Sequence, residues 1–217
     1  MFNTEQIVAQ INFVGGIVLI IAIIIAILKI VINRMSANIK GKTGEGATHL
    51  GLLFKLNSAE YSVLSDLIIP FSGGSAQIDN LVVSPYGIFV IEVKNYKGWI
   101  FGNEKDANWV QNIYGKKNYF MNPLRQNFKH IKALSEYLNL DESYFHNVVF
   151  FIGDCIFKTK MPENVLNRGL SKYIKSKDKK ILNENKMNEI LNKLKETKRK
   201  IKISKKEHLE NIKNYRG

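Results

Sequence analysis

An aspartate, a glutamate and a lysine are the residues whose types and spacing could do chemistry together. Glu92 and Lys94 follow Asp79 by thirteen and fifteen residues, and Val93 separates them from each other. Residues two apart in a strand share a face, so Glu92 and Lys94 are expected to project together. If a hairpin joins these segments, Asp79 lies beside Glu92.

Two adjacent carboxylates in apolar strands indicate a divalent cation. Asp79 and Glu92 lie among Leu, Val, Ile and Phe, where burying charge is costly unless the groups pair or hold a cation. Oxygen ligands with open water positions favour Mg²⁺ or Mn²⁺ over zinc. The alternative is a solvated pair of Glu92 and Lys94 on an exposed sheet face, which the apolar flanks and Asp79 disfavour.

The strands that must position these residues are bounded by turn signals. Pro85-Tyr86-Gly87 is a tight turn, so the strands on either side of it are expected to be antiparallel. A second turn is expected at FSGGS, residues 71–75, and another at Gly115. The predicted strands are 61–70, 76–84, 88–95, 98–102, 108–113 and 147–152.

Helices are predicted on both sides of this strand-rich region. A helix is expected from Thr43, although two glycines weaken its first turn. Asn122-Pro123 is a strong helix start, and this helix is expected to reach about Leu138. Its predicted buried side consists of Leu124, Phe128, Ile131 and Leu138. Met187, Ile190, Leu191 and Leu194 mark a further amphipathic helix. The order indicates a mixed α/β domain with helices flanking a central sheet.

These motifs, taken in order, resemble the nuclease-related domain (NERD) family. They are Gly44-Glu45 opening a helix, QIDNLVVSPYGIFVIEVKNYKG from residue 77, Trp109, and NPLRQN from residue 122. The family is grouped with the restriction-endonuclease-like PD-(D/E)XK nucleases. The resemblance therefore implies a restriction-endonuclease-like mixed central sheet flanked by helices, preceded here by one N-terminal transmembrane helix.

The resemblance also implies a role for each residue of the motif. Asp79 and Glu92 match the metal-binding carboxylates, with the Val93 carbonyl as a third oxygen ligand. Lys94 matches the lysine that polarises the attacking water and stabilises charge on the phosphate, and Glu45 matches a glutamate that supports the metal shell. The implied reaction is hydrolysis of a nucleic-acid phosphodiester. Alternatively, Glu45 only favours the positive end of a helix.

Several other polar and aromatic residues are candidates for the site, and most of them also have a structural interpretation. Gln77 either contacts the site or substrate or caps a strand edge, and Gln126 could reach the site from the first turn of its helix. Trp99 and Trp109 either stack on bases or pack in the core. The four histidines share no metal-ligand spacing and are assigned no function.

A basic stripe is predicted on the helix that begins at Pro123. Arg125, Lys129 and Lys132 recur at i, i+4 and i+7, on the face opposite Leu124 and Phe128. Such a stripe suits a nucleic-acid backbone, and it equally suits an ordinary solvated helix face.

An apolar segment near the N-terminus predicts a membrane span. Phe13–Ile32 carries Lys29 as its one charge, and a helix of this length spans about 30 Å. A cleaved signal peptide would need a basic leader, which residues 1–12 lack. Basic residues follow the span while Glu5 precedes it, so the N-terminus is expected outside and the domain in the cytoplasm, on the cell membrane. The single Cys155 agrees with a reducing compartment.

Net charge is distributed unevenly along the 217 residues. The total is +13, and residues 168–217 hold 17 Lys and Arg against 6 Asp and Glu. The C-terminal lysines could add nucleic-acid affinity, contact anionic lipid near the anchor, or solubilise a tail.

The predicted organisation is a membrane-anchored, metal-dependent nuclease, with DNA favoured over RNA as its partner. The alternatives are a non-catalytic, membrane-tethered nucleic-acid-binding module and a protein scaffold on the same fold. Asp79, Glu92 and Lys94 favour catalysis, because a binding module has no need of buried acids. The expected segments are a short extracytoplasmic N-terminus 1–12, a transmembrane helix 13–32, a linker 33–42, the nuclease-related domain 43–195 and a lysine-rich tail 196–217.

Overall fold

The computed structural model describes residues 4–214, with the side chains of residues 12–30 and 41–201. The chain divides into two compact units, residues 1–42 and 43–217. Helix α1 (Thr4–Lys55) begins in the first unit and ends in the second. Residues 33–42, predicted to be a linker, therefore continue a helix. The side chains of residues 1–11 and of most of the predicted lysine-rich tail lie outside the described residues.

One segment of α1 has the character of a membrane span. Asn12–Ile30 is long and apolar enough to cross a bilayer, and none of its side chains is buried. A helix surface that is apolar on all sides is unfavourable when it is exposed to water. The length and composition of this segment support a membrane anchor.

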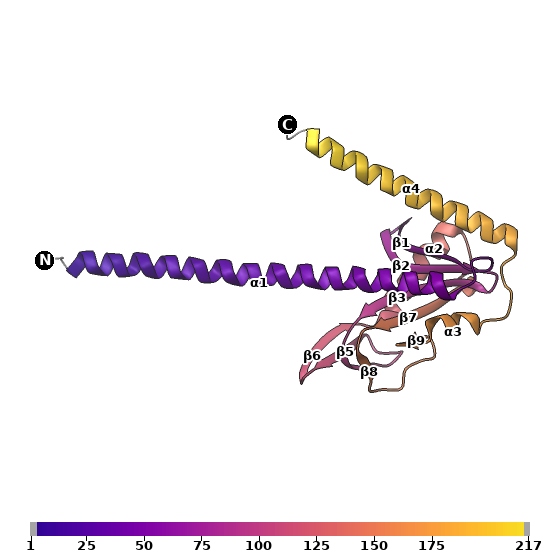
Figure 1. The fold of residues 1–217 in the computed structure, drawn as a ribbon, viewed down its shortest axis with the longest axis horizontal. Coiled ribbons are helices and arrows are strands. Elements are labelled where there is room, and N and C mark those ends of the chain that lie inside the picture. Colours follow the sequence, from indigo (N-terminus) through magenta and orange to yellow (C-terminus); the bar gives the residue numbers. More distant parts are fainter. Residues whose placement is uncertain (1–3, 215–217) are drawn as a thin grey trace. The chain divides into compact units, whose positions relative to one another are not determined.

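The second unit is built around a five-stranded mixed sheet (Figure 1). β1 (Ser62–Phe71), β2 (Gly74–Ser84) and β3 (Gly87–Asn95) form an antiparallel meander. β7 (Phe145–Ile152) and then β9 (Val165–Leu166) add to it in parallel. The sheet order is β1-β2-β3-β7-β9.

A smaller four-stranded sheet follows β3 in the chain. Its order is β6-β5-β4-β8, from β6 (Lys116–Met121), β5 (Asn108–Ile113), β4 (Gly98–Phe101) and β8 (Cys155–Phe157). One of its faces joins the core, where Ile100 and Trp109 pack with Val149 and Phe151 of β7. The two sheets therefore share a hydrophobic core.

Helices cover both faces of the larger sheet. α2 (Pro123–Leu138) and α4 (Glu184–Asn214) pack on one face through residues such as Leu134 and Leu194. The C-terminal part of α1 and the short α3 (Leu170–Lys175) pack on the other, through Leu52 and Ile174. A 3₁₀ turn, η1 (Glu142–Tyr144), leads into β7. The predicted mixed α/β class with flanking helices is confirmed.

The predicted hairpin strands and α2 agree with the structure to within two residues. α4 continues to Asn214, through most of the segment 196–217 that was predicted to be a lysine-rich tail. Phe128 is exposed rather than buried, because Asn127 takes the inward position on α2. β6, β8, β9 and α3 were not predicted.

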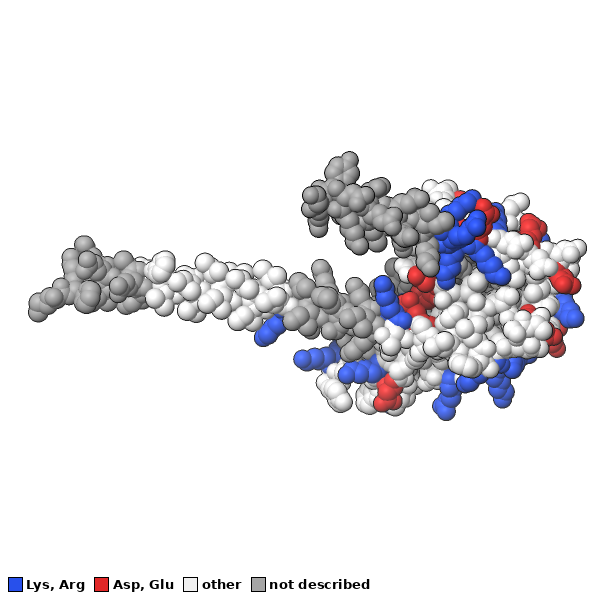
Figure 2. Space-filling model, turned by 45° about the horizontal axis from the view of Figure 1, so that its top comes forward, with Lys and Arg blue, Asp and Glu red and all other residues white. Residues whose placement is uncertain are grey.

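Positive charge is not gathered into one band on the face drawn in Figure 2. Lysine and arginine side chains lie there in several separate groups, with acidic side chains among them. The overall charge of +13 thus does not by itself identify a binding surface.

Candidate active site

The site lies where β2 and β3 separate. Their ladder ends at the pair of Asn80 and Ile91, whereas β3 continues along β7 as far as Asn95. Beyond the ladder, the Val93 N–H donates to Asp79 Oδ2 at 2.9 Å. The aspartate side chain thus connects the two strands at the point where backbone pairing stops.

β1 is also distorted at this level. Its pairing with β2 skips Asp66 and Asp79, which would otherwise be partners. Asp66 has a φ of 49°, in the left-handed region that non-glycine residues rarely occupy. The interruption frees Asp79 from the regular sheet on both of its sides.

Glu92 and Lys94 share one face of β3, as the strand alternation predicts. Lys94 Nζ lies 2.7 Å from Glu92 Oε1 and 2.8 Å from Gln126 Oε1. Gln126 comes from the first turn of α2, so the structure brings it into the site. Glu92 is buried and Lys94 is partly buried. The ammonium is therefore held between one carboxylate and one neutral amide.

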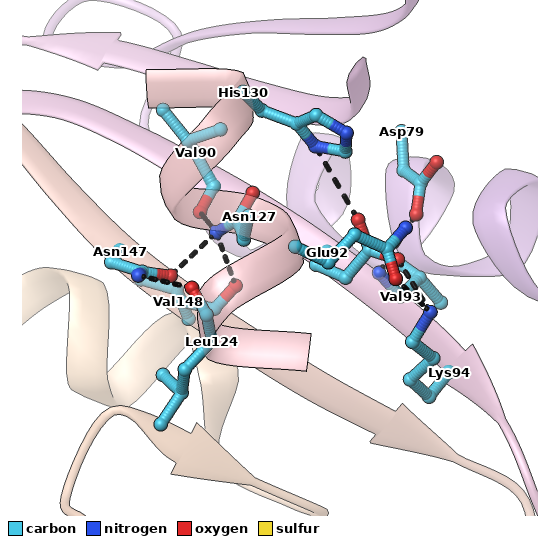
Figure 3. A network of polar contacts seen from close by, with 11 residues as sticks. Asp79, Val90, Glu92, Val93, Lys94, Leu124, Asn127, His130, Asn147 and Val148 are labelled. Atoms are coloured by element: carbon cyan, nitrogen blue, oxygen red, sulfur yellow. Dashed lines mark hydrogen bonds and ion pairs between the residues drawn. The ribbon is translucent and has the colours of Figure 1, made fainter. Parts of the chain in front are cut away.

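His130 is a site residue that the sequence did not reveal. It lies one turn after Gln126 on α2, and its Nδ1 is 3.5 Å from Glu92 Oε2 (Figure 3). Burial lowers the pKa of His130, and Lys94 lowers it further. The histidines were judged by metal-ligand spacing alone, whereas the i, i+4 spacing from Gln126 was the available signal.

Burial works against ionisation of both acids. It raises the pKa of Asp79 to about 7; the charge of Glu92 adds to this rise, while the Val93 N–H and Lys94 oppose it. Burial also raises the pKa of Glu92, against the opposing effect of Lys94 and with a further rise from Glu45. The positive charge of Lys94 therefore does not fully offset the effect of burial on these acids.

Glu45 reaches the site from the C-terminal part of α1. Its carbonyl accepts a hydrogen bond from Asn80 Nδ2 at 3.2 Å. The preceding Gly44 permits this approach, because a Cβ there would lie 3.0 Å from Ile152 Cγ2 and 3.2 Å from Asn95 Cβ. The glycine that seemed to weaken the helix start thus lets α1 pack closely on β3 and β7.

Asn127 fixes α2 over the sheet. Its side chain is fully buried, and its Nδ2 lies within hydrogen-bond distance of Val90 O (2.7 Å), Asn147 Oδ1 (2.8 Å) and Val148 O (3.2 Å). Asn147 Nδ2 in turn donates to Leu124 O at 2.9 Å. This network is drawn in Figure 3. It fixes the part of α2 from which Gln126 contacts Lys94 and His130 contacts Glu92.

Replacement of Asn127 by leucine should destabilise the fold by about 3 kcal/mol, because it removes a buried donor shared by three acceptors. Denaturant unfolding of the full chain in detergent micelles measures this change. Asn118→Leu, on the exposed part of β6, is the matched control and should change stability by less than about 0.5 kcal/mol. Equal stability of the two variants would show that the amide does not secure α2.

The predicted nucleic-acid-binding residues are placed unevenly. Gln77 lies on the exposed part of β2, where its Nε2 donates to Asp66 Oδ1 at 2.9 Å. Of the basic stripe, Arg125 donates to the Lys105 carbonyl, and Lys129 is exposed.

The basic stripe was predicted to lie on the face of α2 opposite Phe128, and this prediction is wrong. Lys132 pairs with Glu142, and its Nζ also lies 5.3 Å from the centre of the Phe128 ring. Because Phe128 shares the exposed face, the stripe surrounds it.

The two tryptophans have different surroundings. Trp109 is fully buried, stacked at 6.2 Å on Phe151. The structure therefore supports core packing, rather than base stacking, as the role of Trp109. Trp99 is exposed, with Lys158 Nζ 4.4 Å from its ring centre.

Asp79 and Glu92 suit a divalent cation that takes few of its ligands from the protein. Among the described residues, no group of three or more His, Cys, Asp or Glu side chains is placed to hold a metal ion. Glu92 Oε2 is buried and lacks a hydrogen-bond partner within the described part of the chain. A buried carboxylate oxygen without a hydrogen bond, in a carboxylate that interacts with a second acid, suits a cation whose other positions are filled by a backbone carbonyl and water, as Mg²⁺ prefers.

The fold and this motif define a nuclease-related class, and comparison with known proteins agrees. The pattern of the nuclease-related domain family matches residues 40–152, so the chain belongs to that family. It is 43% identical over 117 residues to an uncharacterized protein of Bacillus anthracis. The aligned region is 54% of each protein, so the chain spans about half the length of this curated relative. No solved structure matches the chain.

Proposed function

We propose that this protein is a metal-dependent nuclease that hydrolyses phosphodiester bonds of nucleic acids while tethered to a membrane. The observation that carries the proposal is the placement of Asp79, Glu92 and Lys94 where β2 and β3 separate. A purely structural ion pair needs neither the second acid nor a buried carboxylate oxygen that lacks a hydrogen bond. Membership of the nuclease-related domain family supports the same reaction class.

Asp79 and Glu92, with the Val93 carbonyl, would hold Mg²⁺ or Mn²⁺. When bound, such an ion supplies Lewis-acid stabilisation and lowers the pKa of a water molecule. Glu45 adds negative charge behind Glu92 and thereby favours a cation in the site. Asp79, which carries a proton below about pH 7, must lose it before it can bind the ion.

Lys94 supplies positive charge for the phosphate. Its ammonium is kept in place by Glu92 and Gln126, each within 2.8 Å, so little reorganisation is needed as negative charge develops. Gln126 accepts a hydrogen bond from Lys94 without neutralising its charge. A carboxylate in place of Gln126 would neutralise the ammonium and weaken its attraction to a phosphate. His130 lies beside the other oxygen of Glu92, with its Nδ1 3.5 Å from Oε2.

The membrane tether and its orientation are part of the proposal. The exposed apolar segment Asn12–Ile30 supports an anchor, and the lysines and arginine that follow it support a cytoplasmic domain. The C-terminal lysines support contact with anionic lipid on the same side. A nuclease held in this way would act on nucleic acid that passes close to the inner membrane surface.

Purified full chain in detergent micelles tests the reaction. It should degrade DNA or RNA in the presence of Mg²⁺ or Mn²⁺, and a chelator should stop the degradation. DNA is the favoured substrate, so single-stranded DNA, duplex DNA and RNA are assayed in parallel. Binding of these substrates with no cleavage in either metal would replace the nuclease with a non-catalytic nucleic-acid-binding module.

A further inference from the structure

The outward face of the four-stranded sheet carries a row of paired side chains. Register places Ile156 beside Trp99, Trp99 beside Asn112, and Asn112 beside Lys117, across all four strands. Directly paired residues share a face, and so do residues two apart in one strand. Tyr119 and Met121 therefore lie on the same face as Lys117. We call these side chains, with Lys158 beside them, the aromatic sheet face.

This face is apolar yet exposed. Trp99 is 47% exposed and Tyr119 is 73% exposed, and both Ile156 and Met121 are also exposed. The opposite face of the same sheet is buried through Ile100 and Trp109, so the sheet needs no further cover for folding. Two pairs of exposed apolar side chains therefore lie on one face, Trp99 with Ile156 and Tyr119 with Met121. Exposed apolar groups gathered on one face commonly mark a binding surface.

Cations accompany the exposed rings. Lys158 Nζ lies 4.4 Å from the centre of the Trp99 ring, and Lys117 ends the row on β6. A cavity of about 380 Å³ borders the face, with Lys97, Trp99 and Ile156 in its lining and Asp154 as its acidic residue. A flat aromatic surface with lysines beside it complements a polyanion whose bases can stack.

We propose that the aromatic sheet face binds single-stranded nucleic acid, with bases stacked on Trp99 and Tyr119 and phosphates near Lys117 and Lys158. Paired bases in a duplex hide their faces, so stacking selects unpaired segments. A second copy of this chain is disfavoured, because two such faces would bring lysines together. This proposal rests on the proposed function, because the bound strand would be the substrate of the nuclease.

The chain connects this face directly to the site. Trp99 follows Lys94 by five residues, which places their Cα atoms within about 18 Å. The connection is also fixed by hydrogen bonds, since Tyr96 N–H donates to Ile152 O at 3.0 Å and Gly98 N–H to Asp154 O at 2.8 Å. The aromatic sheet face is therefore held at a fixed, short separation from the site.

Binding is measured in the presence of chelator, so that no metal-dependent cleavage occurs. Full chain in detergent micelles is titrated with a single-stranded thymidine oligonucleotide and with a duplex of equal length. The single strand should quench tryptophan fluorescence and bind on the order of tenfold more tightly than the duplex. Trp109→Phe should leave this quenching intact, because Trp109 is buried and Trp99 is the exposed reporter.

Substitutions then locate the surface. Trp99→Ala should weaken binding of the single strand on the order of tenfold, and Tyr119→Ala should also weaken it. Trp99→Phe should restore part of the affinity, because it keeps an aromatic ring. Phe54→Ala, at an exposed aromatic residue of α1, is the matched control and should bind as the wild type does.

The outcomes separate this proposal from the nuclease reaction. Unchanged affinity in both Trp99→Ala and Tyr119→Ala, or equal affinity for single strand and duplex, would overturn the role of the aromatic sheet face. Neither result depends on cleavage. Conversely, a chain that binds single strands through Trp99 but never cuts them would keep this inference and refute the nuclease.

Discussion

Lys94→Met should lower the rate of metal-dependent cleavage by about 10³-fold or more while the chain stays folded. Methionine keeps the length and apolar stem of the side chain but removes the ammonium that Glu92 and Gln126 hold. Loss of one preorganised charge at a reacting phosphate typically costs a factor of about 10² to 10⁴. Single-turnover cleavage by the full chain in micelles measures the effect.

The fold should survive this change because Glu92 can take up a proton. Burial already raises the pKa of Glu92, and Lys94 is the main group that opposes this rise. Without the ammonium the pKa of Glu92 rises further, so the carboxyl takes up a proton more readily and need not remain a buried, unpaired charge. Lys186→Met, which removes the half-buried partner of the exposed Glu189, is the matched control and should keep full activity. An unchanged rate in Lys94→Met would remove this lysine from the mechanism.

Asp79→Asn should abolish stabilisation by Mg²⁺ and, without metal, should make the protein more stable than the wild type at pH 8. Asparagine keeps an acceptor for the Val93 N–H but carries no charge. Because burial raises the pKa of Asp79 to about 7, the folded wild type binds this proton more tightly than the unfolded chain does. The wild type therefore loses stability as pH rises from about 4 to about 7, and the variant escapes that loss.

Thermal melts of both proteins at pH 5 and pH 8, with and without Mg²⁺, test this sign. Mg²⁺ should raise the melting temperature of the wild type at pH 8 and have little effect at pH 5, where Asp79 is protonated. It should leave Asp79→Asn unchanged at both pH values, whereas Asp178→Asn, at an exposed aspartate, should behave as the wild type. Equal metal stabilisation of Asp79→Asn and wild type would refute a cation between Asp79 and Glu92.

The hairpin and its three charged residues could be predicted because local signals determine them. Alternation and the Pro85-Tyr86-Gly87 turn predict the β2–β3 pairing, and that pairing places Asp79 near Glu92. α2 was predictable from Asn122, whose Oδ1 accepts from Leu124 N at 2.9 Å as a helix cap. These features depend on residues that are close together in the sequence.

The remainder depends on packing between distant segments. β8 and β9 have three and two residues, and they are strands because β4 and β7 lie beside them. His130 and Asn127 became site residues through the way α2 docks on the sheet, which periodicity does not specify. The lysine-rich end of α4 is helical because Lys and Glu favour helices, with pairs such as Glu196 and Lys200 at 2.7 Å.

The hydrogen bond from the Val93 amide to Asp79 makes one backbone proton sensitive to events in the site. A proton or a cation that arrives at Asp79 Oδ2 changes the electron density around this acceptor, and hence the environment of the donor. In isotope-labelled protein, the amide resonance of Val93 would shift in NMR spectra as magnesium is titrated. The Val93 amide would thus report metal occupancy without a substrate or a dye.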